Sequence, residues 1–228
     1  MRWRHDGRLM PPAEFMTLAE ETGLIVPMGE WAIRQACAQW RAWADAGAAL
    51  PRVAVNIASQ HFERESLLDT VNLALAESGV PAGVLELEIT ETGVMRDLAR
   101  ALPQLEALKR AGVGLAVDDF GTGYSSLAYL TRLPIEVLKI DRSFIRDLDH
   151  GDQSAAVVTS IVALARSLSL RVVAEGVETA SQCARLAALG CWAGQGWLYA
   201  KAMPAADLER WAREASPFVP APGDGEAA

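Results

Sequence analysis

The stretch "VGLAVDDFGTG" (residues 113–123) joins an apolar run to two adjacent aspartates and a glycine-rich turn. Successive residues of a β-strand face opposite sides, so the bulky Val113, Leu115 and Val117 share one face. The opposite face carries small residues and ends in Asp118. A charged side chain is rarely buried unless it is paired or bound to a metal. The stretch therefore predicts a core strand that leads directly into a functional site.

Five other short runs are rich in β-branched and apolar residues, as this strand is, and helical patterns separate them. The predicted strands are 52–58, 84–90, 113–118, 137–141, 171–175 and 192–198. The predicted helices are 11–23, 28–46, 64–78, 97–112, 154–168 and 179–190. The expected N-caps are Asp97, Thr179 and either Ser154 or Asp152, and the expected C-terminal glycines are Gly79, Gly112 and Gly190.

This alternation indicates βα units with parallel strands, and hence an α/β fold. The spacing of the runs favours a (β/α) barrel over the competing open doubly wound sheet, although such a barrel has eight strands. With 228 residues, of which 51% are hydrophobic, the chain can build one large core or two smaller ones.

The other strands repeat the pattern of an aliphatic face opposite a small or polar face. In a βα barrel the polar face points inward, and functional groups gather at the carboxyl ends of the strands. The side chains predicted to converge there are Asn56, Glu88, Asp118, Lys139, Asp141 and Glu175. A single strand carboxylate could serve only in an ion pair, which is the role expected for Glu86. Packing alone does not explain why five consecutive strands each end in an inward polar or charged residue.

The predicted cluster contains hard oxygen ligands, which suit Mg²⁺ or Mn²⁺ rather than zinc. If Asp118 ends its strand and Asp119 begins the turn, both carboxylates reach one site, as in two-metal centres. Lys139 could orient or acidify a water there. The histidines are scattered, and Cys37, Cys183 and Cys191 are expected to be reduced thiols in a cytoplasmic protein.

The charge and hydropathy of the chain argue against nucleic acid and membrane as partners. The net charge of −8, with no segregated basic stripe, argues against binding to DNA or RNA polymers. No run approaches the roughly 18 apolar residues that a membrane span needs. If the substrate is an anionic phosphate, bound divalent metal is the expected source of positive charge.

Seven motifs in order carry a resemblance to a known family. They are "RWRH" (2–5), "VNIAS" (55–59), "ELEITET" (86–92), "DDFGTGYSSL" (118–127), "LKID" (138–141), "AEGVET" (174–179) and "GQGWLYAKAMP" (194–204). Together they closely resemble the EAL domain family, bacterial phosphodiesterases that hydrolyse cyclic di-GMP to linear pGpG. The resemblance runs from Arg2 to about Trp211 and implies a modified TIM barrel.

The resemblance also implies roles for individual residues. It makes Asn56, Glu88, Asp118 and Asp119 the ligands of a two-metal site for Mg²⁺ or Mn²⁺. It makes Lys139 and Glu175 the groups that position and deprotonate the attacking water. It places Arg2, Asp141 and Gln195 at the substrate, and makes Glu91 and Glu178 supports of two loops. It further implies a homodimer through the loop after Asp118–Asp119.

The resemblance has one large departure at its start. The family's Glu-Ala-Leu segment precedes "RWRH", and Met1 falls one position after the place of its leucine. We therefore expect residues 1–215 to form a TIM-type (β/α)8 barrel of the EAL type that lacks its first strand and part of the second. Its activity is expected to be impaired, because the glutamate of that segment is a metal ligand. Residues 216–228 are expected to be a flexible tail.

Two smaller departures lie near the other end. Trp197 stands where the family usually has tyrosine, and Ala202 where it often has proline. Two alternative functions stay open. One is an inactive EAL module that binds cyclic di-GMP or a protein partner. The other is a magnesium-dependent barrel enzyme of the enolase type, which the Asp118–Asp119 pair and its Gly-Thr-Gly turn disfavour.

Overall fold

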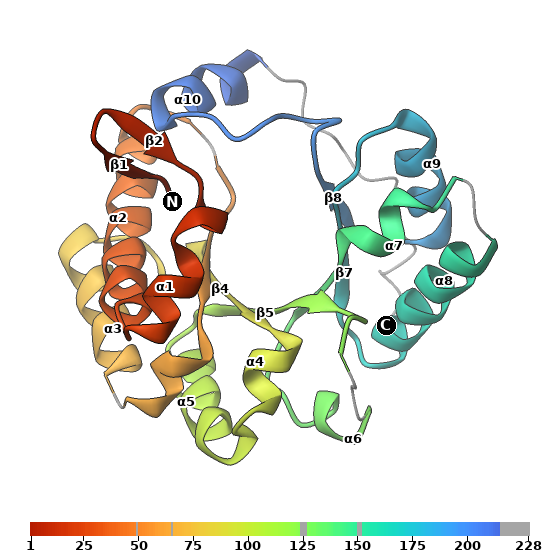
Figure 1. Cartoon of the computed structure of the whole chain (residues 1–228), viewed down its shortest axis with the longest axis horizontal. Coiled ribbons are helices and arrows are strands. Elements are labelled where there is room, and N and C mark those ends of the chain that lie inside the picture. The colour runs from red at the N-terminus through yellow and green to blue at the C-terminus, as the bar shows by residue number, and fades with distance from the viewer. Residues whose placement is uncertain (49, 65, 124–126, 150–151, 215–228) are drawn as a thin grey trace. The chain divides into compact units, whose positions relative to one another are not determined.

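The computed structural model describes residues 1–48, 50–64, 66–123, 127–149 and 152–214 (Figure 1). The chain divides into two compact units, which are described separately. The first unit comprises Met1–Ile89 and Gly93–Gly114, and the second comprises Thr90–Thr92 and the chain from Leu115 onward. The predicted tail at 216–228 lies outside the described residues.

The first unit consists of a hairpin followed by helices and a pair of parallel strands. Its elements are β1 (Trp3–His5), β2 (Arg8–Met10), η1 (Pro12–Glu14), α1 (Met16–Glu21), α2 (Ile25–Asp45), β3 (Val53–Ile57), η2 (Ser59–Glu63), α3 (Leu67–Ser78), η3 (Ala82–Val84), β4 (Leu85–Thr90) and α5 (Leu98–Arg110). Strands β3 and β4 are parallel, as predicted, and Asn56 pairs in register with Glu88. The α4 helix (Glu91–Met95) begins in the second unit and ends in the first.

The β1–β2 hairpin was not predicted from the sequence. Its strands are antiparallel, and the connecting Asp6 and Gly7 have φ angles of 46° and 76°. Positive φ at both central residues is the geometry of the tight hairpin turns that favour an Asp-Gly pair. The pair was therefore a usable signal, but the strands are only three residues long and show no apolar alternation.

The second unit is built on four parallel strands in the order β5-β6-β7-β8. Its elements are β5 (Gly114–Phe120), α6 (Leu127–Leu130), β6 (Val137–Ile140), α7 (Arg142–Arg146), α8 (Asp152–Ser167), β7 (Arg171–Glu175), α9 (Ala180–Leu189), β8 (Ala193–Gln195) and α10 (Ala205–Glu214). In Figure 1, α8 and α9 lie on the same side of β7 and β8. All six predicted strands are present, and the short helices α4, α6, α7 and α10 are additional.

The predicted caps agree with the structure except at the start of α8, whereas the predicted starts of α2 and α3 are each three residues from the observed ones. Asp97 caps α5 by accepting a hydrogen bond from the N–H of Arg100, and Thr179 caps α9. Gly79 and Gly190 end their helices in the left-handed conformation, with φ of 64° and 88°. The α8 helix begins at Asp152, so the predicted cap at Ser154 is wrong because that residue lies inside the first turn.

The predicted strand faces are confirmed by burial. Leu85, Leu87 and Ile89 of β4 are at most 1% exposed, which places their common face in the core. Glu86 forms the expected ion pair, with 2.5 Å between its Oε2 and Arg52 Nη1. All three cysteines lie within the described residues, and none forms a disulfide.

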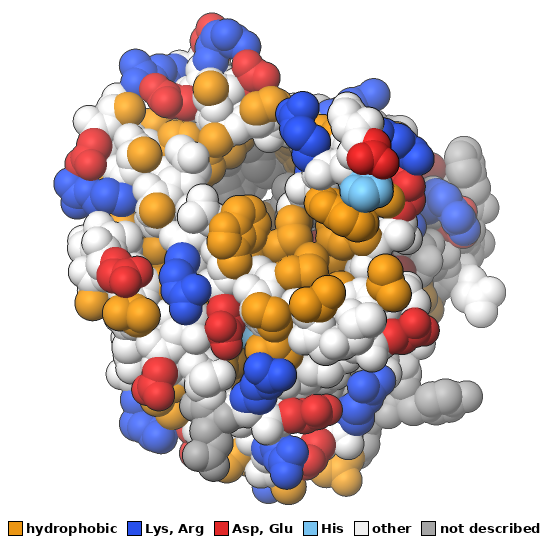
Figure 2. Space-filling view, turned by 60° about the vertical axis from the view of Figure 1, so that its left-hand side comes forward, with side chains coloured by type: hydrophobic (Ala, Val, Ile, Leu, Met, Phe, Trp, Pro, Cys, Tyr) orange, Lys and Arg blue, Asp and Glu red, His pale blue; other side chains and the backbone are white. Residues whose placement is uncertain are grey.

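Two surface properties complete the description. Figure 2 shows apolar side chains gathered over the face that carries the β1–β2 hairpin, α1 and α2. Exposed large apolar residues of these elements and of the turn before α2 are Trp3, Leu9, Leu18, Leu24 and Trp31. Such clusters are typical of contact surfaces. Among the described helices, none is both long enough and apolar enough to cross a bilayer.

A buried histidine fixes the segment that follows β3. His61 is 2% exposed, and its Nδ1–H donates to the carbonyl of Ala58 at 3.0 Å. Burial lowers the pKa of His61, so the ring is held neutral. A Cβ on Gly29 of α2 would lie 2.2 Å from His61 Nε2. The close approach of α2 to this ring therefore requires glycine at position 29.

We predict that Gly29→Ala destabilises the protein by about 1–3 kcal/mol, because the added methyl group must displace the buried ring. Urea unfolding measures the change. The matched control is Gly83→Ala, whose Cβ would meet nothing closer than 3.9 Å. That control should alter the free energy of unfolding by no more than about 0.5 kcal/mol. Equal stability of the two variants would contradict the packing of α2 on His61.

Candidate active site

The first unit contributes two of the predicted metal ligands. Asn56 and Glu88 are register partners on β3 and β4, so their side chains leave the same face of the strand pair. Glu88 is 7% exposed, whereas Asn56 is exposed. Arg2 belongs to the same unit; it is exposed, and its guanidinium donates to the carbonyl of Met1 at 3.1 Å.

The second unit brings four predicted site residues together. Asp118, Asp119 and Glu175 each offer a carboxylate oxygen within 4.8 Å of the other two. The Nζ of Lys139 lies 3.3 Å from Asp118 Oδ1 and 2.6 Å from Glu175 Oε1. Lys139 is only 3% exposed, so its ammonium group depends on these carboxylates for compensation. The four residues come from the neighbouring strands β5, β6 and β7.

The two adjacent aspartates reach one site by a route that differs from the prediction. We expected Asp118 to end the strand, but β5 continues to Phe120. The pairing of β5 with β6 shifts register between Val117 and Phe120, and Asp119 has a φ angle of 54°. A bulge of this kind turns a side chain that would otherwise point to the opposite face. The N–H of Asp119 also donates to Asp118 Oδ1 at 3.0 Å.

Burial and neighbouring charge raise the pKa of two carboxylates in the cluster. Burial raises the pKa of Asp119, and the charges of Asp118 and Asp141 raise it further. Burial also raises the pKa of Glu175, against the opposing effect of Lys139. One ammonium group faces three carboxylates. The cluster therefore has surplus negative charge, which a bound cation would relieve.

Two other predicted residues adjoin the cluster. Asp141 caps α7, and its Oδ1 accepts from the N–H and the hydroxyl of Ser143 at 3.0 and 2.5 Å. Burial alone would raise the pKa of Asp141, but these hydrogen bonds outweigh it and lower the pKa. Gln195 of β8 is the register partner of Glu175. Their pairing places both residues at the same edge of the sheet.

Comparison with known proteins decides the family. The sequence profile described as "EAL domain" matches residues 1–202. The chain belongs to the EAL domain family. It is 49% identical over 209 residues to the bifunctional diguanylate cyclase/cyclic di-GMP phosphodiesterase MucR of Pseudomonas aeruginosa. The aligned residues make up 91% of this chain and 30% of MucR. It is 45% identical over 214 residues to the cyclic di-GMP phosphodiesterase NbdA of the same organism, covering 93% of the chain and 27% of NbdA.

A solved structure agrees with this assignment. The structure titled "PaMucR Phosphodiesterase, c-di-GMP complex" is 49% identical and has a TM-score of 0.86, covering 91% of this EAL domain and 84% of that chain. The predicted family and the TIM-type fold of the EAL domain are therefore confirmed. The chain spans less than a third of the length of MucR and of NbdA.

Glu91 lies against the turn that follows the bulge. It is 2% exposed, and its Oε2 accepts from the N–H of Gly121 at 2.9 Å. A Cβ on Gly123 would lie 2.5 Å from Glu91 Oε1, so a larger residue in this turn would have to displace the carboxylate. The part of the expected dimer loop at 124–126 lies outside the described residues.

Gln182 is a supporting residue that the sequence analysis missed. It is 5% exposed, and its Oε1 accepts from the N–H groups of Glu178 and Thr179 at 2.8 and 3.1 Å. Its Nε2 donates to the carbonyl of Ile145 in α7 at 3.1 Å. The amide thus links the turn after Glu175 to the helix that Asp141 caps. The capping-box spacing of Thr179 and Gln182 was the available signal.

Glu178, the residue expected to support this turn, has an exposed side chain. Among the described residues, only its backbone N–H makes a hydrogen bond, and the acceptor is Gln182 Oε1. The observed anchor of the turn is therefore Gln182.

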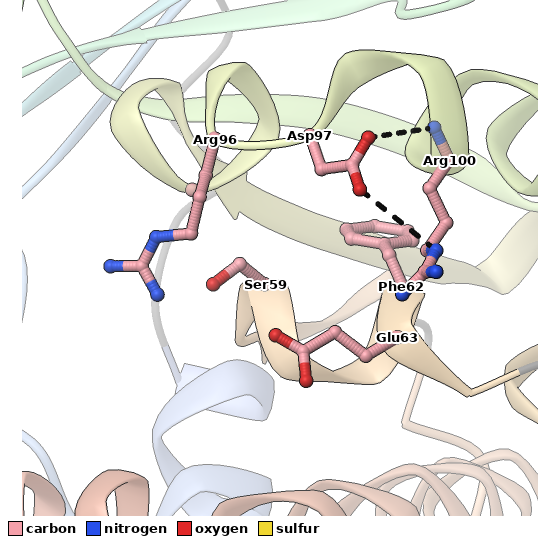
Figure 3. A pocket seen from close by; sticks show the side chains of 7 residues that line it. Ser59, Phe62, Glu63, Arg96, Asp97 and Arg100 are labelled. Carbon is pink, nitrogen blue, oxygen red and sulfur yellow. Dashed lines mark hydrogen bonds and ion pairs between the residues drawn. The ribbon is translucent and has the colours of Figure 1, made fainter.

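Two of the cavities among the described residues differ in character. One, of about 770 Å³, is lined by Glu175, Gln195, Trp197 and their neighbours in the second unit. The other, of about 220 Å³, lies in the first unit and is shown in Figure 3. Its Asp97 is engaged by Arg100, and none of the predicted site residues lines it. The larger cavity is therefore the one connected with the carboxylate cluster.

We predict that Gln182→Ala lowers the free energy of unfolding by about 1–3 kcal/mol, because it removes the partner of the buried Ile145 carbonyl and of two part-buried N–H groups. Gln182→Glu should be intermediate, since its carboxylate still accepts from the turn but cannot donate to Ile145. Urea unfolding measures both. Gln153→Ala on the exposed side of α8 is the control and should be near neutral. A neutral Gln182→Ala would show that the turn is held by other contacts.

Proposed function

We propose that this EAL domain hydrolyses cyclic di-GMP to linear pGpG. The observation that carries the proposal is the cluster of Asp118, Asp119, Lys139 and Glu175 at the carboxyl ends of three adjacent strands. Relatives that share 49% and 45% of its residues are named cyclic di-GMP phosphodiesterases. The solved relative with a TM-score of 0.86 is titled as a complex with c-di-GMP.

The cluster fits a divalent metal centre. Three carboxylates lie within 4.8 Å of one another, the pKa values of Asp119 and Glu175 are raised, and the group offers only hard oxygen donors, which suit Mg²⁺ or Mn²⁺. Asp118 and Asp119 would hold the metals, with Asn56 and Glu88 as the ligands assigned by resemblance. Two such ions, when bound, neutralise phosphoryl charge and favour formation of a hydroxide nucleophile.

The domain's own side chains supply proton transfer and orientation. One carboxylate oxygen of Glu175 is bound to Lys139 at 2.6 Å, which fixes the group and leaves the other oxygen to accept a proton from water. Lys139 also contacts Asp118 at 3.3 Å, so the same ammonium group aligns the proposed base and a proposed ligand. Asp141 lies beside Asp119, and Gln195 pairs in register with Glu175. Arg2 is proposed to meet a substrate phosphate.

A homodimer and a cytoplasmic location belong to the same proposal. The dimer is supported by the resemblance and by Glu91, which holds the turn that begins the expected dimer loop. The location is supported by the three cysteines, none of which is in a disulfide. Sedimentation velocity of the purified domain tests the dimer directly.

We predict that the domain forms pGpG from cyclic di-GMP when Mg²⁺ or Mn²⁺ is supplied, and that chelation with EDTA stops the reaction. Asp118→Asn should lower turnover by at least about 100-fold, because it removes a carboxylate from the centre of the cluster. Chromatographic quantification of pGpG measures both effects.

The control for this prediction is Asp207→Asn, at a partly exposed residue of α10 that pairs only with Arg210 among the described residues. Its turnover should equal that of the unchanged domain. Binding of cyclic di-GMP without pGpG formation would favour the alternative of an inactive binding module. Undiminished turnover of Asp118→Asn would contradict the two-metal assignment.

A further inference from the structure

The smaller cavity, in the first unit, takes no part in the proposed reaction. Its volume is about 220 Å³, and its walls come from η2, which follows β3, and from the junction of α4 and α5, which follows β4 (Figure 3). The lining side chains are those of Ser59, Phe62, Glu63, Arg96, Asp97 and Arg100. Sites for drug-sized ligands occupy about 300–1,000 Å³, so this cavity suits a smaller ligand, of the size of an amino acid.

The backbone that frames the cavity is held by contacts within the protein. The carbonyl of Phe62 in η2 accepts a hydrogen bond from Gln104 Nε2 at 2.8 Å, which joins η2 to α5. The buried His61 fixes η2 through the carbonyl of Ala58, and the start of α5 is held by its Asp97 cap. The two walls are therefore fixed relative to each other.

The four charged side chains of the cavity differ in their pairing. Asp97 and Arg100 engage each other, with 3.9 Å between Arg100 Nε and Asp97 Oδ2. Arg96 and Glu63 are exposed, and neither side chain makes an ion pair or a hydrogen bond with another described residue. Figure 3 shows the Arg96 guanidinium extending from the α4–α5 junction toward the side of η2 that carries Ser59 and Glu63.

A cation and an anion that line one cavity without pairing suit a ligand that carries both charges. In an α-amino acid, the carboxylate and the ammonium group are attached to the same carbon atom. An arginine side chain presents parallel donors to a carboxylate, and a glutamate accepts hydrogen bonds from an ammonium group. A simple anion such as phosphate would gain from Arg96 but would be repelled by Glu63 and Asp97.

The cavity also offers an apolar surface. Phe62, whose side chain is 4% exposed, lines it together with Gly93, which adds no side chain. Ligand sites commonly combine such apolar walls with a few polar groups that fix the orientation of the ligand. The lining therefore favours an amino acid whose own side chain is apolar.

We propose that this cavity is a second binding site of the domain, and that its ligand is a free α-amino acid with an apolar side chain. Arg96 binds the carboxylate, Glu63 binds the ammonium group, and the side chain packs on Phe62. The inference does not depend on the proposed function, because no residue of the carboxylate cluster lines this cavity.

Binding is tested on the complete chain by isothermal titration calorimetry with L-leucine, L-isoleucine, L-methionine and L-phenylalanine. At least one of them should bind saturably. Its N-acetyl derivative, which lacks the ammonium charge, and its amide derivative, which lacks the carboxylate, should each bind at least about 10-fold more weakly. Absence of binding by all four amino acids would overturn the proposal.

Arg96→Gln and Glu63→Gln test which residue binds which end of the ligand. Each should raise the Kd of the preferred amino acid by about 10-fold or more, because each removes a charge-assisted hydrogen bond. Arg96→Gln should not change the Kd of the amide derivative, and Glu63→Gln should not change that of the N-acetyl derivative, because these ligands lack the group concerned. An equal rise for the amino acid and its derivative would overturn the assignment.

Arg110→Gln and Glu106→Gln are the matched controls. Both residues lie on α5 outside the cavity, with 4.0 Å between Arg110 Nη1 and Glu106 Oε2. Each control changes the net charge by the same amount as its counterpart in the cavity, and its Kd should equal that of the unchanged chain. A rise as large as that of the cavity variants would show a general effect of charge and overturn the site. Thermal melting checks that each variant is folded.

Discussion

The buried ammonium group of Lys139 is the point on which the candidate site depends. At 3% exposure it has lost most of its hydration, and transfer of such a charge from water costs several kcal/mol unless carboxylates compensate it. The compensation comes from Asp118 on β5 and Glu175 on β7, the strands on either side of the one that carries Lys139. One lysine thus joins three strands at their carboxyl ends. The third carboxylate, Asp119, adds negative charge that Lys139 cannot neutralise, and a bound cation would relieve this surplus.

The surplus is created by a local distortion of β5. A regular strand would direct Asp118 and Asp119 to opposite faces. The bulge and the positive φ angle of Asp119 bring both carboxylates to one side, at a cost of about 1–2 kcal/mol for a residue with a Cβ. Such conformations persist where surrounding contacts enforce them. Here the Glu91 carboxylate holds the N–H of Gly121 immediately after the bulge.

The segment after β7 is held in a comparable way. Gln182 secures the turn after Glu175, and Val177 binds the backbone of Gln195 and Leu198 on either side of Trp197. None of these contacts uses the side chains of Trp197 or Glu178, which are exposed. The proposed base, Glu175, and the cavity-lining residues Trp197 and Glu178 therefore lie on segments that these contacts hold together.

The sequence by itself predicted the six strands of the sheet and four residues that the second unit brings together, Asp118, Asp119, Lys139 and Glu175. Period-two alternation predicted the buried face of β4 and the inward positions of Glu88, Asp118 and Lys139, because side-chain direction in a strand follows from position alone. Asp97 and Gly79 predicted helix ends for the same reason, since caps are local. The tertiary structure decided the bulge that aligns the two aspartates, because a register shift depends on the neighbouring strand. It also decided the role of Gln182, whose partner Ile145 is 37 residues away in the chain. Only the folded chain could bring Trp197 into the same cavity as Glu175, because contacts between distant segments have no local signal.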